Sequence, residues 1–330
     1  MRYAVIGTGW IADSYVQGAA RSGNWELAAV CSRSRETGLA FGGKYGVSAV
    51  CTSPEELAAD PSIPAVYIAS PNCCHYEQSR MMLEAGKHVL CEKPVTVTPE
   101  GCRDLQELAE KRGLVYLEAI MMLHQPHLAA VESAIARLGR IRAARLSFDQ
   151  LSSKYPAYLR GELPNIFNPK MATGSLMDLG IYCVYPAVAW FGVPDRIEAA
   201  ASFLPSGADA ACSAIFGYPD KLVTLDCCKT GQSCLGSEIL GDEGTLEIRS
   251  ISQLTGVVLH RKDGGCETIV GEAEKAALMG NEAADFYRYI AGPASSREQY
   301  RRDSRLALEV SRAMAEIRAR AGIRFEGEFR

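Results

Sequence analysis

The tripeptide Glu92-Lys93-Pro94 directly follows a short apolar run, His88 to Cys91. We interpret this run as a buried strand, so Lys93 would lie at its carboxyl end, the edge at which open parallel α/β sheets bind ligands. Pro94 ends the strand and restricts the backbone after Lys93. The tripeptide therefore predicts an ammonium group held where a cofactor and a substrate could meet. The alternative is a surface lysine in a turn.

Asp178 and Tyr182 form a second candidate pair. They lie four residues apart in an apolar segment, about Gly174 to Phe191, that we expect to be a helix, so they would share one face. Polar groups in such a segment need a polar partner. If this face met the strand end carrying Lys93, the three would form a proton-transfer cluster, because a nearby ammonium lowers the pKa of tyrosine, about 10 when free. The alternative is a pair that only packs a domain interface.

A glycine-rich motif near the start of the chain predicts dinucleotide binding. Gly7-Thr8-Gly9-Trp10-Ile11-Ala12 fits G-x-G-x-x-G/A. The first glycine permits a tight turn, the second admits a pyrophosphate, and the small last residue lets helix and strand pack closely. The motif follows an expected strand and opens an expected helix, which is the context it requires.

The end of the second expected strand predicts which nicotinamide cofactor binds. It reads Cys31-Ser32-Arg33-Ser34-Arg35, with no carboxylate before Glu36. An acidic residue there would bind the ribose hydroxyl of NAD, whereas an arginine accommodates the 2′-phosphate of NADP. Ser32 and Arg33 therefore predict a preference for NADP(H), with NAD(H) as a second cofactor. The alternative is a solvated basic turn.

The first 120 residues alternate apolar runs with helix signals. Ser53-Pro54-Glu55-Glu56 has the serine, proline and glutamate of a helix start, and Thr98-Pro99 repeats the first two. This alternation predicts βαβ units and a parallel sheet with helices on both faces. The expected strands are Tyr3–Ile6, Leu27–Cys31, Ala65–Ala69, His88–Cys91 and Leu114–Leu117.

The pattern changes after about residue 120. A helix from about Pro126 to Leu138 precedes strand-like runs joined mostly by short turns, which indicates antiparallel pairing. Helical stretches near Glu282–Ile290 and Ser304–Arg320 close the chain. We predict an α/β protein: residues 1–120 form a Rossmann domain with a doubly wound parallel sheet, and residues 121–330 form a substrate-binding and dimerisation α+β domain with a largely antiparallel open sheet. The expected strands are Ile141–Phe148, Arg196–Phe203, Cys212–Gly217, Leu222–Cys228, Ser237–Leu240, Thr245–Ile248 and Val257–Leu259.

The segment Leu151–Thr173 has no clear periodicity and contains several aromatic and amide side chains. Long irregular loops in compact domains often bind ligands, and the alternative is a surface excursion. Tyr155 and Asn165 are our candidates for contact with a substrate.

Composition limits the classes of function. The chain has 330 residues, 48% of them hydrophobic and 22% charged, and a net charge of −4, so nothing indicates a nucleic-acid partner. No apolar run is long enough to cross a membrane. The start lacks the features of a secretory signal, which predicts a cytoplasmic protein. None of the twelve cysteines lies in a Cys-x-x-Cys pair, so we predict free thiols, no disulfide and no metal site.

These motifs, in this order, resemble those of the glucose–fructose oxidoreductase/inositol dehydrogenase/MocA family over residues 1 to about 190. The other matching pieces are Ala69-Ser70-Pro71-Asn72 with His75, and Glu118-Ala119. The resemblance implies hydride transfer between a nicotinamide and a hydroxyl carbon of a sugar, polyol or related molecule. It assigns Lys93 to the catalytic lysine. The residues it places along the cofactor are Ser70, Asn72, His75 and Glu92.

Two positions bear on the substrate. Tyr182 stands where many members carry histidine, which makes the chain more similar to dihydrodiol dehydrogenase-type and glucose–fructose oxidoreductase-type members. Leu123 stands where relatives often carry arginine, so their substrate contacts cannot be copied. We expect an NADP(H)-dependent oxidoreductase, as a homodimer or higher homo-oligomer. The alternatives are an NAD(P)-dependent glycosidase with transient oxidation and a non-catalytic NADP-binding sensor.

Overall fold

The computed structural model describes residues 1–325, apart from the side chains of residues 275 and 276. The chain forms two compact units. The first consists of Met1–His124 with Glu274–Leu308, and the second of Gln125–Ala273 with residues 309–325. The return of the chain to the first unit was not predicted from the sequence. No helix in the described residues is long and apolar enough to cross a membrane.

The first unit contains a six-stranded sheet whose hydrogen-bonded pairs are all parallel, in the order β3-β2-β1-β4-β5-β6. This confirms the predicted Rossmann sheet. Only the two-residue edge strand β3 was not predicted. The strands are β1 (Arg2–Ile6), β2 (Glu26–Cys31), β3 (Val50–Cys51), β4 (Ala65–Ile68), β5 (His88–Glu92) and β6 (Tyr116–Ala119).

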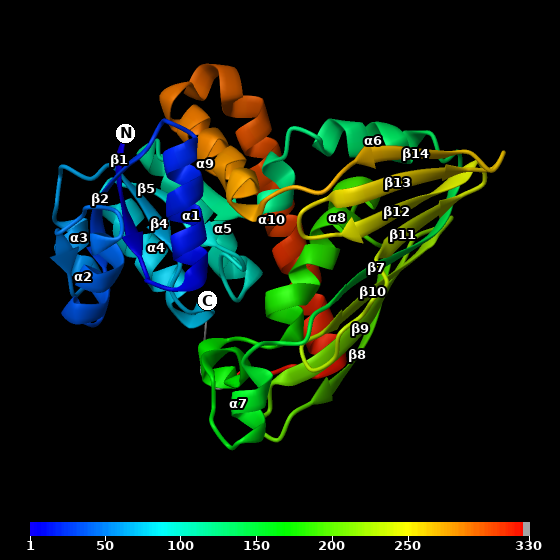
Figure 1. Cartoon of the computed structure of the whole chain (residues 1–330), viewed down its shortest axis with the longest axis horizontal. Coiled ribbons are helices and arrows are strands. Elements are labelled where there is room, and N and C mark those ends of the chain that lie inside the picture. The colour runs from blue at the N-terminus through cyan, green and yellow to red at the C-terminus, as the bar shows by residue number, and fades with distance from the viewer. Residues whose placement is uncertain (326–330) are drawn as a thin grey trace. The chain divides into compact units, whose positions relative to one another are not determined.

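Helices cover both faces of this sheet, as Figure 1 shows. Tyr3 and Val5 of β1 belong to one apolar core, and the alternate residues Ala4 and Ile6 belong to the other. This alternation follows from strand geometry, in which successive side chains point to opposite faces. The helices from this part of the chain are α1 (Trp10–Arg21), α2 (Arg35–Gly43), α3 (Pro54–Ala58), α4 (His75–Glu84) and α5 (Pro99–Arg112), with short 3₁₀ turns at Asn72–Cys74 and Met121–His124.

Helix α9 (Lys275–Ala291) packs against α1, although some 250 residues separate them in the chain. Trp25, which directly precedes β2, stacks on Phe286 with ring centroids 5.3 Å apart. Its indole N–H donates to the backbone oxygen of Ala283 at 2.7 Å. These contacts bury apolar surface from a late segment against an early one. They explain why α9 belongs to the first unit.

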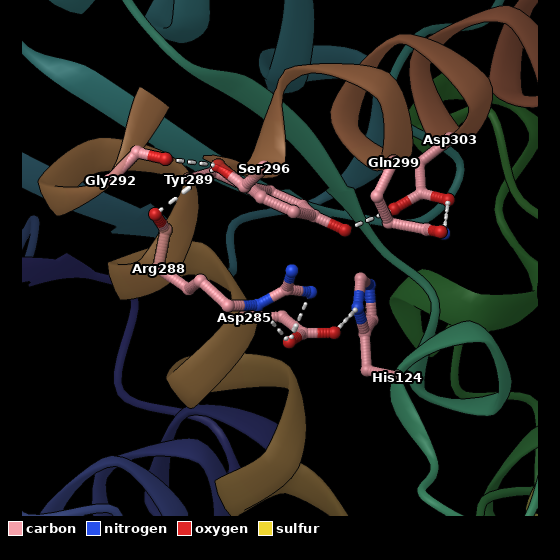
Figure 2. A network of polar contacts seen from close by, with 8 residues as sticks. All are labelled: His124, Asp285, Arg288, Tyr289, Gly292, Ser296, Gln299 and Asp303. Carbon is pink, nitrogen blue, oxygen red and sulfur yellow. Dashed lines mark hydrogen bonds and ion pairs between the residues drawn. The ribbon is translucent and has the colours of Figure 1, made fainter. Parts of the chain in front are cut away.

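A polar network joins α9 to the start of α10 (Pro293–Ala321), which begins in the first unit and ends in the second (Figure 2). His124 Nδ1 lies 3.0 Å from Asp285 Oδ2 on α9. The Tyr289 hydroxyl donates to Asp303 Oδ2 at 2.5 Å, and Gln299 donates to the other oxygen of that carboxylate at 2.8 Å. The network fixes the turn between the two helices.

The second unit contains an eight-stranded sheet in the order β14-β13-β12-β11-β7-β10-β9-β8. All its pairs are antiparallel except β7 with β10, which confirms a largely antiparallel sheet. Strand β14 was not predicted. The strands are β7 (Ile141–Asp149), β8 (Arg196–Phe203), β9 (Asp209–Gly217), β10 (Leu222–Cys228), β11 (Ser237–Gly241), β12 (Gly244–Ser250), β13 (Thr255–Arg261) and β14 (Cys266–Val270).

One face of this sheet is covered and the other is open. Buried and more exposed residues alternate along β9, β10 and β12. Helix α8 packs against β7 and β10, and α6 lies along the edge strand β14. The helices of this unit are α6 (Leu128–Ala136), α7 (Tyr155–Leu159) and α8 (Ile181–Phe191), with 3₁₀ turns at Asn165–Phe167 and Pro169–Met171 and a π-helical turn at Leu176–Gly180.

Candidate functional site

The carboxyl ends of β1 and β4 mark the point where the strand order of the first sheet reverses. Ligands bind at such a point in open α/β sheets. Gly7, after β1, has φ +110°, and a Cβ there would overlap the backbone oxygen of Ala69, after β4. Only glycine allows the two chain segments to approach this closely in this conformation.

Gly9 leaves open space at the start of α1, as the binding of a pyrophosphate would require. It is the N-cap residue of α1, with φ −75°, and a Cβ there would have no heavy atom within 4 Å. The helix N-terminus supplies backbone N–H groups and the positive end of the dipole. Thr8 and Ile11 are half-buried and Trp10 is 68% exposed, so the motif lies at the surface of the unit. These residues fit a bound dinucleotide.

The end of β2 presents the predicted NADP residues. Ser32 is half-buried and Arg33 is exposed. Burial raises the pKa of the Cys73 thiol to about 11, and the Arg33 guanidinium opposes this rise. Because β2 runs parallel to β1, Arg33 lies on the same edge of the sheet as Gly7.

His75 holds two loops of this edge together. It begins α4, is completely buried, and its Nδ1 and Nε2 lie 2.8 Å from the Pro94 oxygen and 2.9 Å from the Ser70 oxygen. Burial lowers the pKa of His75, and the charge of Lys93 adds to this effect. Asn72 is 8% exposed, and the Ser70 hydroxyl donates to Gln78 at 2.7 Å. His75 was expected along the cofactor, but its buried ring instead contacts the backbone oxygens of Ser70 and Pro94.

The edge continues at β5. Lys93 directly follows this strand, as predicted, and is half-buried. Glu92 is buried and accepts a 2.5 Å hydrogen bond from the Tyr67 hydroxyl. Burial, together with the Glu92 charge, raises the pKa of Tyr67 well above its usual value, so Tyr67 stays protonated as the donor. The backbone N–H of Val95 donates to Glu118 Oε1 at 2.7 Å, which fixes the chain after Lys93 from the next strand.

The second unit carries Asp178 and Tyr182. The predicted single helix is a π-helical turn, Leu176–Gly180, that continues into α8. Such turns occur frequently at functional sites. Asp178 and Tyr182 are the half-buried residues in an otherwise buried run from 176 to 188, which supports a shared face. The Tyr182 ring packs edge-on against Phe148, with centroids 5.5 Å apart.

Lys229 is a charged partner of Asp178 that was not predicted from the sequence. It directly follows β10, is 4% exposed, and forms an ion pair with Asp178 Oδ2. Asp209 lies in the same buried region and accepts a hydrogen bond from the Leu176 N–H at 2.7 Å. The only signal in the sequence was a lysine at the end of an expected strand, which resembles Lys93 in that respect.

The segment Leu151–Thr173 is more ordered than expected, since it contains α7 and two 3₁₀ turns. Tyr155 packs against Tyr158 and Phe167, with ring centroids 6.2 and 5.9 Å apart. Asn165 is exposed, and its backbone oxygen accepts a hydrogen bond from Thr173 at 2.7 Å. Contact of Tyr155 or Asn165 with a substrate stays a prediction.

All twelve cysteines are free thiols. In residues 1–325, no cluster of three or more His, Cys, Asp or Glu side chains could hold a metal ion.

Comparison with known proteins identifies the family. Residues 1–119 match the model of an oxidoreductase family with an NAD-binding Rossmann fold, and residues 130–247 match the GFO/IDH/MocA C-terminal domain. The scyllo-inositol 2-dehydrogenase (NADP(+)) IolU of Bacillus subtilis is 34% identical over 323 residues, which cover 98% of each chain. This chain belongs to the GFO/IDH/MocA family of oxidoreductases. The family predicted from the motifs is therefore confirmed.

A further relative and a solved structure are also similar to this chain. Trans-1,2-dihydrobenzene-1,2-diol dehydrogenase of Mus musculus is 27% identical over 267 residues, covering 79% of this chain and 78% of that protein. The crystal structure of KijD10, a 3-ketoreductase from Actinomadura kijaniata, has a TM-score of 0.82 at 23% identity and covers 97% of this chain and 98% of its own. That likeness shows the shared fold. The curated relatives are both named as dehydrogenases and support neither the glycosidase nor the sensor.

Proposed function

We propose that this GFO/IDH/MocA protein is an NADP(H)-dependent dehydrogenase that oxidises a secondary hydroxyl of a polyol or sugar, or reduces the corresponding ketone. The observation that carries the proposal is one edge of the first sheet, where Gly7, Gly9, Arg33 and Lys93 follow strands or open a helix around the same reversal point. The names of the inositol dehydrogenase relative and of the solved 3-ketoreductase support this substrate class and the NADP cofactor.

The proposed preference for NADP(H) rests on the exposed Arg33 beside Ser32. A guanidinium can pair with the 2′-phosphate through two parallel hydrogen bonds, and no carboxylate at the end of β2 competes for the ribose. Thr8, Trp10 and Ile11 belong to the turn that would hold the pyrophosphate. Ser70, Asn72 and Glu92 are proposed to lie along the cofactor, with His75 supporting their loops.

Three side chains are proposed to carry the chemistry. Oxidation of an alcohol removes a hydride from carbon and a proton from oxygen, and the nicotinamide accepts the hydride when it is bound. Lys93 donates a hydrogen bond to the reacting oxygen and stabilises negative charge on it. Tyr182 exchanges the proton with that oxygen. Asp178 accepts a hydrogen bond from a substrate hydroxyl, and Tyr155 and Asn165 are proposed to contact the rest of the substrate.

Turnover with defined substrates tests this function. The purified protein is mixed with scyllo-inositol, or with other polyols, sugars and dicarbonyls, in the presence of NADP⁺ or NADPH, and NADPH absorbance is followed. We expect turnover of at least one polyol or sugar, faster with NADP⁺ than with NAD⁺. Binding of NADPH without turnover of any compound would contradict the proposal and favour a sensor. Release of free sugar from a glycoside without a net change in absorbance would favour a glycosidase.

We also propose that the protein is a cytoplasmic homodimer or higher homo-oligomer. The free cysteines fit a reducing compartment. On the open face of the second sheet, the apolar residues Ile215 and Leu222 are 42% and 50% exposed, and a second copy could cover them. Light scattering at micromolar concentration should give at least twice the mass of one chain, whereas a monomer would contradict the proposed assembly.

A further inference from the structure

Lys229 lies in a position where an ammonium group must be paired. Its backbone N–H donates to the oxygen of Ala210 at 2.9 Å, which fixes the residue at the end of β10. Its side chain is only 5% exposed. Taking a charge out of water costs several kcal/mol unless a partner of opposite charge and hydrogen bonds replace the water.

The partner of this ammonium is the carboxylate of Asp178. Lys229 Nζ forms an ion pair with Asp178 Oδ2, and the Asp178 side chain is 19% exposed. Lys229 also lies 5.8 Å from the centre of the Phe167 ring, on the segment that carries Asn165. The ion pair therefore joins a strand end, the π-helical turn and the candidate substrate loop within one unit.

A second carboxylate holds the turn that carries Asp178. Asp209 is completely buried, and its Oδ2 accepts the Leu176 N–H at the start of the π-helical turn. A Cβ on Gly174 would overlap this carboxylate, so a larger residue there would displace it. Burial raises the pKa of Asp209 to about 6; the Leu176 N–H and the charge of Lys229 oppose the rise, and Asp178 adds to it. Lys229 thus interacts electrostatically with both carboxylates, and Arg318 of α10 interacts electrostatically with Asp209.

We propose that Lys229 is a positioning residue that fixes the Asp178 carboxylate in the orientation in which it accepts a hydrogen bond from the substrate. This inference rests on the proposed function, because it concerns how Asp178 is held for that reaction. Lys229 forms an ion pair with one oxygen of the Asp178 carboxylate, which is itself partly exposed. Binding of a hydroxyl needs such an oriented acceptor, and a misplacement of 1 Å can cost roughly 100-fold in rate.

Stability alone does not explain this pair. Replacing a buried ion pair by apolar residues of similar volume is often neutral or stabilising, whereas removing one partner leaves an uncompensated charge. A lysine and an aspartate that only held the fold together could therefore be exchanged jointly for apolar residues without loss. The position of Asp178 on a π-helical turn, four residues before Tyr182, instead suggests that its carboxylate is used.

A double-mutant cycle with Lys229→Met and Asp178→Asn tests the proposal. With scyllo-inositol and NADP⁺, we expect Lys229→Met to lower kcat/KM by about 10- to 100-fold, because the carboxylate is no longer oriented. Lys229→Arg keeps the charge and should retain more activity than Lys229→Met. The double variant should lose no more than Asp178→Asn alone, because Lys229 acts through Asp178. The dissociation constant for NADPH, which binds the first unit, should not change.

Lys262→Met is the matched control, since Lys262 forms an exposed ion pair with Glu243 at 3.5 Å. It should leave kcat/KM unchanged. The proposal is overturned if Lys229→Met keeps kcat/KM within twofold of the wild type, or if the losses of the two single variants multiply in the double variant.

Thermal unfolding of the same four proteins separates this inference from the proposed function. The Tm loss from Lys229→Met should be larger in the wild-type background than in the Asp178→Asn background, whatever the substrate is. If no polyol or sugar is turned over but the two Tm losses differ in this way, the proposed function is wrong and the pairing of Lys229 with Asp178 is supported. Equal Tm losses in the two backgrounds would overturn the pairing itself. Variants that unfold at assay temperature are replaced by Lys229→Gln, which is closer to lysine in polarity.

Discussion

The Nδ1 atom of His75 lies 2.8 Å from the backbone oxygen of Pro94, one residue after Lys93. The other ring nitrogen lies 2.9 Å from the oxygen of Ser70. A residue that begins a helix after one strand thus supports the loops at the ends of two strands. This arrangement makes the position of Lys93 depend on a buried imidazole.

Replacing His75 by phenylalanine should destabilise the protein by about 1–3 kcal/mol, because the ring is retained but a buried carbonyl oxygen loses its donor. The NADPH dissociation constant should rise as well. His75 has a lowered pKa, first because of burial and then because of Lys93. Its contribution is therefore present above the unfolded pKa of about 6.5 and is lost as the pH falls from that value through the lower folded pKa. Denaturant unfolding of wild type and variant between pH 5 and 8 measures the loss of stability and its dependence on pH.

His260→Phe is the control for that experiment, since His260 is 43% exposed in its side chain and pairs with Glu247 on the sheet of the second unit. It should cost less stability than His75→Phe and leave NADPH binding unchanged. An equal loss in the two variants would contradict the structural role of His75.

Gly7→Ala and Gly9→Ala should separate folding from cofactor binding. At Gly7, with φ +110°, a methyl group would overlap the Ala69 oxygen, so both stability and NADPH affinity should fall. At Gly9 a methyl group would have no protein atom within 4 Å, so the Tm should stay near that of the wild type. It would nevertheless occupy the space for the pyrophosphate, so NADPH affinity should fall. Unchanged NADPH binding by Gly9→Ala would argue against this binding site.

Arg33→Ala should weaken NADPH binding by about 10- to 100-fold and leave NADH binding within about threefold. The 2′-phosphate would lose charge-assisted hydrogen bonds worth roughly 1.5–3 kcal/mol. Arg35→Ala is the matched control, because Arg35 is also exposed and its guanidinium donates to the oxygen of Val50 at 3.3 Å. Fluorescence titration of the wild type and both variants with NADPH and NADH measures the dissociation constants. Tighter binding of NADH than NADPH by the wild type would refute the proposed preference.

Lys93→Met and Tyr182→Phe should each lower kcat on an identified substrate by about 100- to 10,000-fold, the range typical of proton-transfer catalysis. The NADPH dissociation constant of Tyr182→Phe should stay unchanged, because Tyr182 is assigned to the proton and not to the cofactor. Single-turnover kinetics with NADP⁺ would show whether the hydride step is the one slowed. Full turnover by both variants would show that the catalytic assignment is wrong.

Asp209→Asn should change how stability depends on pH. The amide can still accept from the Leu176 N–H but cannot titrate. Asp209 has a folded pKa of about 6, raised from 3.8 mainly by burial. Its contribution is therefore present below the unfolded pKa and is lost as the pH rises through about 6. The Tm of the wild type minus that of the variant should be a few degrees larger at pH 4.5 than at pH 7.5. A difference that does not depend on pH would contradict this pKa.

Much of the fold followed from local patterns. The apolar run of β1, the glycines after it and the cap signals at Ser53 and Thr98 act over a few residues, so they can be read without knowing distant contacts. Both predicted caps form: the Ser53 and Thr98 side chains accept N–H groups three residues on. The same kind of local pattern predicted that Lys93 directly follows β5.

What the sequence by itself determined is the parallel and antiparallel sheets, the dinucleotide turn and the family. Only the tertiary structure decided that α9 packs on α1, that His75 supports Pro94, and that Lys229 pairs with Asp178. Each of these contacts joins residues that are distant in the chain, and Lys229 lies 51 positions from Asp178. Burial and charge pairing select such partners only after the strands have been arranged in space, so no periodicity in the sequence records them.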